Sequence, residues 1–134
     1  MELVSPEQFE SVRKLQKKLM NGLTEGIDGT VINGPSDLSR RHPGNVNVSF
    51  NRIEGESVVL HLDMRGISVI TGSACFSRSL EPSYVMMAMG FSHERAHGSI
   101  RFTMSRFNRE AEVDQVISHC QDVVTALRKI SPLK

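Results

Sequence analysis

Apolar side chains recur along the first 25 residues at the spacing of one face of an α-helix. The stripe consists of Phe9, Val12, Leu15, Leu19 and Leu23. Ser5 and Pro6 precede it, and Gln8 follows Ser5 by three residues, which is the arrangement of a capping box with proline in the first turn. The pattern predicts a helix that begins after Ser5 and ends near Gly22 or Gly26.

The chain then changes to the two-residue period of β-strands. Residues 45–50 alternate between polar and apolar side chains, so Val46, Val48 and Phe50 share one face. The stretch from Ser99 to Met104 alternates in the same way around Phe102. Strands are therefore expected at residues 30–33, 45–50, 67–70 and 99–104, with residues 34–45 as a loop.

Helical spacing returns between and after these strands. Residues 54–65 predict a helix that Gly66 ends, and a short helix opens at residues 81–83 and ends at Gly90. Ser92 is expected to cap one more turn through His97. The methionines of the short helix are interpreted as core fillers: Met86, Met87 and Met89.

The last predicted helix has Asn108 as its expected cap and Pro132 beyond its end. Its apolar stripe consists of Val113, Val116, Ile117, Cys120, Val123, Val124, Leu127 and Ile130. The whole order of helices and strands predicts an α+β fold, in which helices pack on a small, mainly antiparallel sheet.

Composition narrows the possible functions. The chain has 134 residues, which suits one domain, and a formal net charge of +1 gives no reason to expect binding to nucleic acid or to an anionic membrane. No apolar run approaches a membrane span, and the N-terminus lacks the pattern of a secretory signal. Two cysteines make no disulfide framework, so a cytoplasmic protein is expected.

The run from Thr71 to Tyr84 places Cys75 in a loop rich in glycine and serine. Such a loop lets a thiol reach outward, and loops on a rigid scaffold often carry chemistry. Cys75 is therefore either a nucleophile or sulfur carrier or an incidental free thiol. Cys120 differs, because its place in a helical core stripe is typical of a packed structural cysteine.

Arg101 lies between two apolar strand residues and should point to the opposite face of the sheet. A guanidinium held there suits a carboxylate, although the strand pattern alone favours a solvated arginine or a structural ion pair. His93 and His97 are four residues apart, but no carboxylate completes a metal site, so capping or packing roles are favoured. No metal site is expected.

Several motifs in order resemble the C-terminal portion of the cysteine desulfurases, which are class V aminotransferase-like, pyridoxal-phosphate enzymes that supply sulfur for iron–sulfur cluster assembly. The resemblance covers residues 9–133 and rests on Val48-Ser49-Phe50, Glu54-Gly55-Glu56-Ser57, Gly72-Ser73-Ala74-Cys75, Ser79-Leu80-Glu81-Pro82-Ser83-Tyr84-Val85, Ser99-Ile100-Arg101-Phe102 and Arg106-Phe107. It implies the C-terminal small domain of a fold-type I pyridoxal-phosphate enzyme.

The resemblance also implies roles for individual residues. Cys75 matches the cysteine that takes sulfur from L-cysteine as a persulfide, with alanine released. Arg101 matches the arginine that binds the α-carboxylate of the substrate. The persulfide then passes to an acceptor, usually an iron–sulfur scaffold protein.

The sequence matches only the family's small domain. The large domain of the family supplies the Schiff-base lysine and most contacts to pyridoxal phosphate, so residues 1–134 are expected to form a single small domain that does not bind the cofactor alone. L-cysteine, a large domain in cis or in trans, and a sulfur acceptor are the expected partners, and family members are usually homodimers. The alternative is a non-catalytic sulfur carrier, an interaction module or an inactive remnant.

Overall fold

The structure is a computed structural model that describes residues 5–72 and 81–133. In chain order its elements are α1 (Pro6–Gly26), β1 (Thr30–Ile32), the 3-10 helix η1 (Leu38–Arg40), β2 (Asn45–Phe50), α2 (Gly55–Asp63), β3 (Ile70–Thr71), α3 (Tyr84–Ala88), α4 (His93–His97), β4 (Ser99–Thr103) and α5 (Glu110–Ile130). No helix of the described residues is long and apolar enough to cross a membrane.

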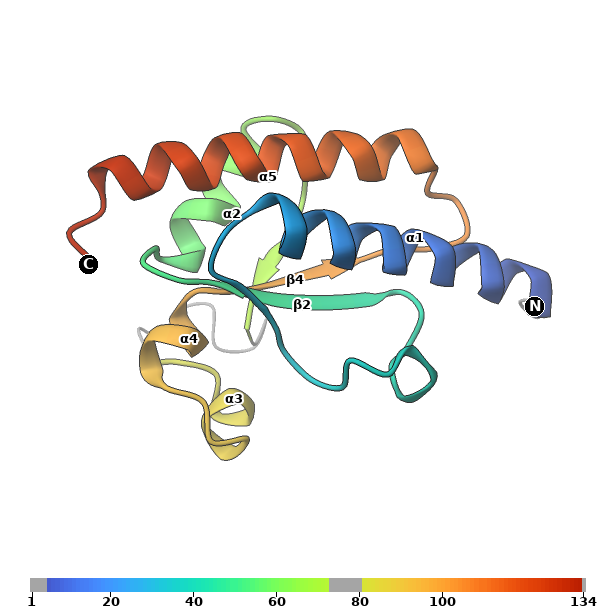
Figure 1. The fold of residues 1–134 in the computed structure, drawn as a ribbon, viewed down its shortest axis with the longest axis horizontal. Helices are drawn as coiled ribbons and strands as arrows, with labels where there is room; N and C mark the ends of the chain where they lie inside the picture. Colours follow the sequence, from blue (N-terminus) through green and yellow to red (C-terminus); the bar gives the residue numbers. More distant parts are fainter. Residues whose placement is uncertain (1–4, 73–80, 134) are drawn as a thin grey trace.

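The described strands form one antiparallel sheet in the order β1-β2-β4-β3. Helices α1, α2 and α5 cover one face, whereas α3 and α4 lie beyond the other face near one end (Figure 1). The core lies between the sheet and the three larger helices, and includes Val46, Val48, Phe50, Ile100 and Phe102. The expected α+β fold is confirmed.

Helix α1 begins as the sequence predicts. The backbone N–H of Gln8 donates to Ser5 Oγ at 3.3 Å, and the N–H of Ser5 donates to Gln8 Oε1 at 2.9 Å, so both halves of the capping box are formed. Five of the helix's hydrophobic residues are buried: Val12, Leu15, Leu19, Met20 and Leu23.

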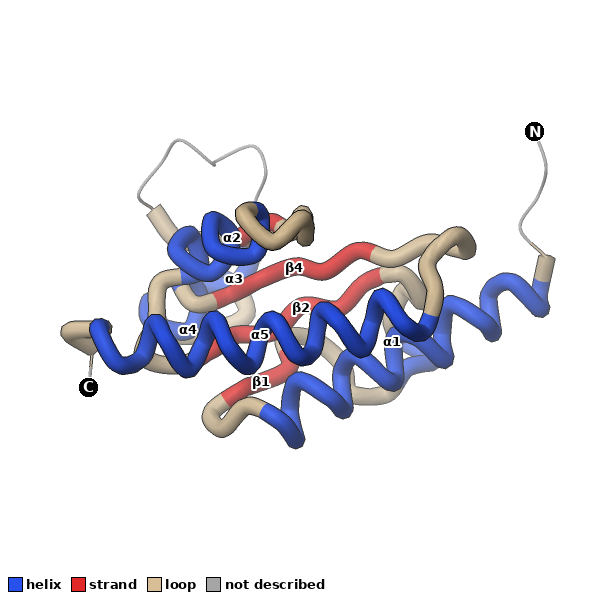
Figure 2. The backbone as a smooth tube through the Cα atoms, turned by 90° about the horizontal axis from the view of Figure 1, so that it is seen from above, coloured by secondary structure: helices blue, strands red, loops and turns tan. Residues whose placement is uncertain are grey.

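Helices α1 and α5 lie side by side across the sheet (Figure 2). Lys18 Nζ bridges them, at 2.8 Å from Glu110 Oε1 and 2.9 Å from Asp114 Oδ1. Gly22 allows the close approach, because a Cβ added there would lie 2.3 Å from the Cδ1 atom of Ile117. The two helices therefore form one layer that covers the apolar face of the sheet.

The expected cap of the last helix is wrong by one residue. Helix α5 has Arg109 at its N-cap, and the N–H of Arg109 donates to Glu112 Oε2 at 2.8 Å. Asn108 instead accepts from the N–H of Ser105 and donates through Nδ2 to Glu112 Oε2. Glu112 Oε2 thus accepts from both Asn108 and Arg109. Asn108 stabilises the turn before the helix and does not cap it.

The strand expected at residues 67–70 is shorter and begins later. Helix α2 ends in a turn in which Gly66 has a φ of 78° and the N–H of Ile67 donates to Leu62 O at 3.0 Å. This bond closes the end of the helix, so Ile67 belongs to the helix terminus and pairing starts only at Ile70. The helix itself spans 55–63, within the expected 54–65.

Some residues expected in the core are exposed. Ile130, the last residue of α5, is 78% exposed, and Met89, the residue that caps the C-terminal end of α3, is 49% exposed. Met86 is buried but lies outside the core cluster between the sheet and the three larger helices, so the three methionines do not fill that core as expected.

We expect the Leu23→Ala substitution to lower the free energy of unfolding by about 2–5 kcal/mol, because Leu23 is fully buried and its loss leaves a cavity. Leu60→Ala is the matched control, since Leu60 also lies on a helix but is 61% exposed. Its effect should stay within about 0.5 kcal/mol. Urea unfolding followed by circular dichroism measures both, and equal losses would contradict the placement of the core.

Candidate functional site

Polar side chains line the face of the sheet that α1, α2 and α5 leave open. On β2 and β4 the apolar residues point into the core, so the residues between them point to the open face. These polar residues are Asn45, Asn47 and Ser49 on β2, and Ser99, Arg101 and Thr103 on β4. The sequence prediction for the direction of Arg101 is confirmed.

Arg101 is half-buried, and its Nε atom is fully buried with no hydrogen-bond partner among the described residues. None of the ion pairs between described residues involves Arg101. A buried donor without an acceptor is costly, and a guanidinium presents a planar fork of donors that matches a carboxylate. The arrangement therefore suits an anionic ligand, and the structural ion pair that the sequence left open is not found among these residues.

A hydrogen-bond network surrounds Asn33 and includes Asn47, which faces Arg101 across the β2–β4 pair. Asn33 Nδ2 donates to Asn47 Oδ1 and to Ser49 Oγ, both at 2.8 Å, and Asn33 Oδ1 accepts from Arg95 Nε at 2.9 Å. Ser49 Oγ donates to the backbone oxygen of Arg95 at 2.7 Å. This network fixes α4 against β1 and β2.

Two cations support the network from the edge of the sheet. Arg95 Nη2 donates to Ile32 O at 3.1 Å, and its guanidinium lies 3.6 Å from the ring centroid of Phe91. Arg41 is buried and donates to the backbone oxygens of Asn33 and Pro35. Burial lowers the pKa of Arg41, because desolvation disfavours the charged form.

Residues 2–116 match the aminotransferase class-V family. The chain belongs to this family. It is 44% identical over 128 residues to cysteine desulfurase IscS of Clostridium botulinum, covering 96% of this chain and 32% of the relative. It is 48% identical over 124 residues to cysteine desulfurase IscS of Methylococcus capsulatus, covering 92% of this chain and 30% of the relative. The chain thus spans about a third of the length of the curated relatives it matches.

Solved structures of similar proteins have the same fold. A NifS-like protein aligns with a TM-score of 0.76 and 30% identity, over 90% of this chain and 29% of that chain. A NifS-like protein from Rickettsia africae aligns with a TM-score of 0.75 and 22% identity, over 90% of this chain and 30% of that chain. This second similarity shows the fold alone. The resemblance to cysteine desulfurases that the sequence motifs indicate is confirmed.

The class-V family uses pyridoxal phosphate, which needs a lysine to form its Schiff base. The described lysines are Lys14, Lys17, Lys18 and Lys129. They lie on α1 and α5, on the helix side of the sheet, whereas Arg101 points to the other side. These residues do not fit the cofactor, so no step through it is assigned to them.

Cys75 lies outside the described residues, and its predicted role stays a prediction. Cys120 lies on α5, is fully buried and has no disulfide. Burial raises the pKa of the Cys120 thiol to about 12, because an apolar environment disfavours the thiolate. The interpretation of Cys120 as a packed structural cysteine is confirmed.

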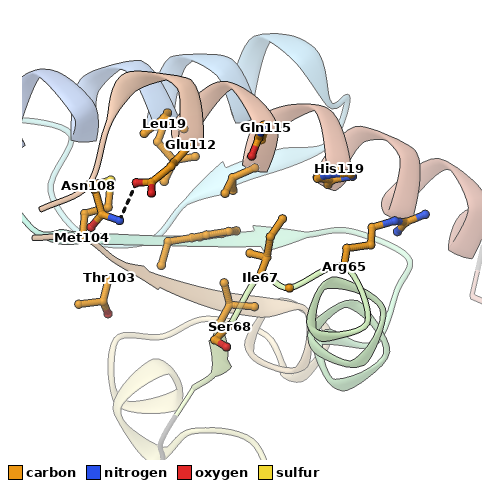
Figure 3. Close-up of a pocket in the computed structure, with 15 residues that line it drawn as sticks. Leu19, Arg65, Ile67, Ser68, Thr103, Met104, Asn108, Glu112, Gln115 and His119 are labelled. Carbon is orange, nitrogen blue, oxygen red and sulfur yellow. Dashed lines mark hydrogen bonds between the residues drawn. The ribbon is translucent and has the colours of Figure 1, made fainter.

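A pocket of about 350 Å³ lies on the helix side of the sheet and was not predicted from the sequence. It lies between α5, residues 65–69 and the end of β4 (Figure 3). Phe102 and Val116 contribute apolar walls, and Arg65 and His119 are among its polar residues. Because Phe102 and Arg101 point to opposite faces of β4, this pocket is separate from the Arg101 site.

Among the described residues there is no group of three or more histidine, cysteine, aspartate or glutamate side chains that could hold a metal ion. His93 and His97 form the two ends of α4, and Ser92 caps this turn by accepting from the N–H of Arg95 at 3.2 Å. The expected cap at Ser92 is confirmed.

We expect the stability of the chain to fall at alkaline pH through Cys120. The pKa of Cys120 is about 12 in the folded chain against an ordinary 9.0. The stabilisation that the protonated thiol gives to the folded chain is therefore fully present below pH 9 and is lost as the pH rises toward 12. Between pH 8 and pH 10 the free energy of unfolding should fall by about 1 kcal/mol more in the wild type than in Cys120→Ala. Urea unfolding at the two pH values measures this difference, and parallel pH profiles would rule out the buried thiol as its source.

Proposed function

We propose that the chain acts as the small domain of a cysteine desulfurase, in which Arg101 binds the α-carboxylate of L-cysteine and Cys75 receives its sulfur. The observation that carries the proposal is the buried Nε atom of Arg101, a cationic donor without an acceptor among the described residues. The similarity to curated cysteine desulfurases over most of the chain supports the choice of substrate.

The overall reaction converts L-cysteine and an acceptor thiol into L-alanine and a persulfide. The bond between the substrate's Cβ and its sulfur breaks, and a sulfur–sulfur bond forms with the thiolate of Cys75. The substrate carbon is reduced and the transferred sulfur is oxidised to the sulfane level, so no external oxidant is needed. The proton lost from the attacking thiol is balanced by the proton that the former Cβ gains as the methyl group of alanine.

Covalent geometry keeps the two residues in one region. Thr71 pairs with Ile100 and Ile70 pairs with Arg101, so β3 ends next to Arg101. Cys75 follows Thr71 by four residues, and four residues span at most about 14 Å. The strand fixes the carboxylate-binding group, and the connected segment supplies the thiol.

In this proposal residues 1–134 form a single small domain, and a large domain in cis or in trans provides pyridoxal phosphate and the Schiff-base lysine. The persulfide on Cys75 passes to an iron–sulfur scaffold or another sulfur acceptor in the cytoplasm, and the assembled enzyme is a homodimer. A sulfur carrier would use Cys75 without Arg101, so the orphaned donor favours the enzyme.

We expect activity when this chain replaces the matching segment of the Methylococcus capsulatus relative. The hybrid should release alanine from L-cysteine and accumulate a persulfide on Cys75. Cys75→Ser should lower alanine release on the order of a thousandfold or more, because the nucleophile is removed. Cys120→Ser is the matched control and should retain activity.

Mass spectrometry of the persulfide and an alanine assay give the two readouts. The isolated chain, given pyridoxal phosphate and L-cysteine, should release no alanine. An active hybrid that tolerates Cys75→Ser would show that Cys75 is not the nucleophile. A persulfide formed on Cys75 by inorganic polysulfide, together with an inactive hybrid, would favour the sulfur carrier.

We also expect alkylation to distinguish the two thiols. Iodoacetamide at pH 8 should label Cys75 in the folded chain well before Cys120, because the thiolate is the reactive species and burial raises the pKa of Cys120. In denaturant the two rates should become equal. Peptide mapping measures the labelling, and faster labelling of Cys120 in the folded chain would contradict the assignment of the nucleophile.

A further inference from the structure

Four residues form a straight row across the open face of the sheet. The N–H of Asn33 donates to Asn47 O at 2.9 Å, Asn47 faces Arg101 in the β2–β4 register, and Arg101 faces Ile70. Residues in such a row lie on the same face because the strands share one pleat. Asn47 is therefore the cross-strand neighbour of Arg101 on the side away from β3.

The hydrogen-bond pattern brings Asn47 and Arg101 especially close. Bonds from Met104 N–H to Gly44 O at 2.8 Å and from Phe50 N–H to Gly98 O at 3.0 Å mark alternate pairs of the β2–β4 ladder. Asn47 and Arg101 fall between these pairs. In such non-hydrogen-bonded pairs the Cα atoms are about 4.5 Å apart and the side chains are closest.

The amide of Asn47 is oriented from the other side. Its Oδ1 atom accepts from Asn33 Nδ2, and Asn33 is itself held by Arg95 Nε at its Oδ1 atom. This chain of donors fixes which atom of each amide is the oxygen. Asn47 Nδ2 is left as a donor with no acceptor among the described residues, on the residue that faces Arg101 across the β2–β4 pair. Of the two groups, only the Nε atom of Arg101 is buried without a partner.

We infer that Asn47 is a second binding residue for the carboxylate, donating from Nδ2 beside Arg101. The inference rests on the proposed function of Arg101 and adds the group that sets the position of the ligand. Two adjacent donors from neighbouring strands suit a carboxylate, which accepts on both oxygens. Asn33 and Arg95 are positioning residues, because they act through Asn47 and do not touch the ligand.

The test measures carboxylate binding by the full chain and needs no turnover. Acetate and L-alanine are titrated into ¹⁵N-labelled protein at constant ionic strength, and the side-chain resonances of Asn47 and Arg101 are followed by NMR. Both should shift with one common dissociation constant. Asn47→Ala should raise that constant about tenfold, since a hydrogen bond to a charged group is lost.

Asn45→Ala is the matched control. Asn45 lies on the same strand and the same face, but it faces Thr103 rather than Arg101, so its substitution should leave binding unchanged. Arg101→Gln should abolish binding. If Arg101→Gln abolishes binding and Asn47→Ala has no effect, the role of Asn47 is overturned and that of Arg101 stands. If Arg101→Gln has no effect, the proposed carboxylate site itself is wrong.

Asn47→Asp provides a second measurement that does not depend on tight ligand binding. The substitution keeps the oxygen that accepts from Asn33 and replaces the donor beside Arg101 by an acceptor. The introduced carboxylate should pair with Arg101, so its pKa should lie below that of the carboxylate introduced by Asn45→Asp. It should also compete with acetate.

In the Arg101→Gln background the competition with acetate should disappear and the pKa difference should shrink to the part that the hydrogen bond from Asn33 causes. Equal carboxylate pKa values in the Asn47→Asp and Asn45→Asp variants, with Arg101 present, would show that the Asn47 side chain does not face the guanidinium and would overturn the inference.

Discussion

The pairing of β2 with β4 is the constraint on which the rest of the structure depends. In this register Val46, Val48, Ile100 and Phe102 all point toward the three larger helices. Because side chains alternate along a strand, the same register sends Asn47 and Arg101 to the other face. A slip of one residue would exchange the two sets. Burial of the apolar side chains therefore fixes the positions of the polar side chains on the opposite face, although the two sets do not touch each other.

The open face is polar, yet most of its buried groups are satisfied. Asn33, Ser49 and Ser99 are nearly or fully buried, and each has a hydrogen-bond partner in its own vicinity. Folding usually satisfies such groups, since an unpaired buried donor costs free energy. Against this background the Nε atom of Arg101 stands apart. A buried cation without an acceptor beside otherwise satisfied buried groups is typical of a site that a ligand completes.

The sequence predicts the parts of this fold that depend on local periodicity. The capping box of α1 and the alternation of β2 are both properties of neighbouring residues, and both are confirmed. The cap of α5 and the start of β3 were wrong, because each depends on competition between nearby groups. Glu112 bonds the N–H of Arg109, and the end of α2 holds Ile67. Such competition is decided by three-dimensional geometry.

The candidate site was predictable only in part for the same reason. Arg101 lies in a family motif and in a stretch with the alternation of a strand, so the face to which its side chain points could be predicted from the sequence. Asn47 lies 54 residues earlier in the chain, and its relation to Arg101 exists only through the register between β2 and β4. Asn33 and Arg95 are 62 residues apart in the chain, and their roles follow from hydrogen bonds between separate elements. The periodicity of the sequence shows to which face of a strand each side chain points. Only the pairing of the strands shows which residue of the next strand lies beside it.

The proposed function assigns different physical requirements to Arg101 and to Cys75. A carboxylate-binding group acts best from a rigid strand, because its geometry must be set before the ligand arrives. In the proposed function the thiol of Cys75 has a different task, because it takes sulfur from one partner and gives it to another. β3 is only two residues long, so the sequence that leads to Cys75 begins one residue pair from Arg101. The short strand thus pairs with the strand of Arg101 directly before the stretch of sequence in which Cys75 lies.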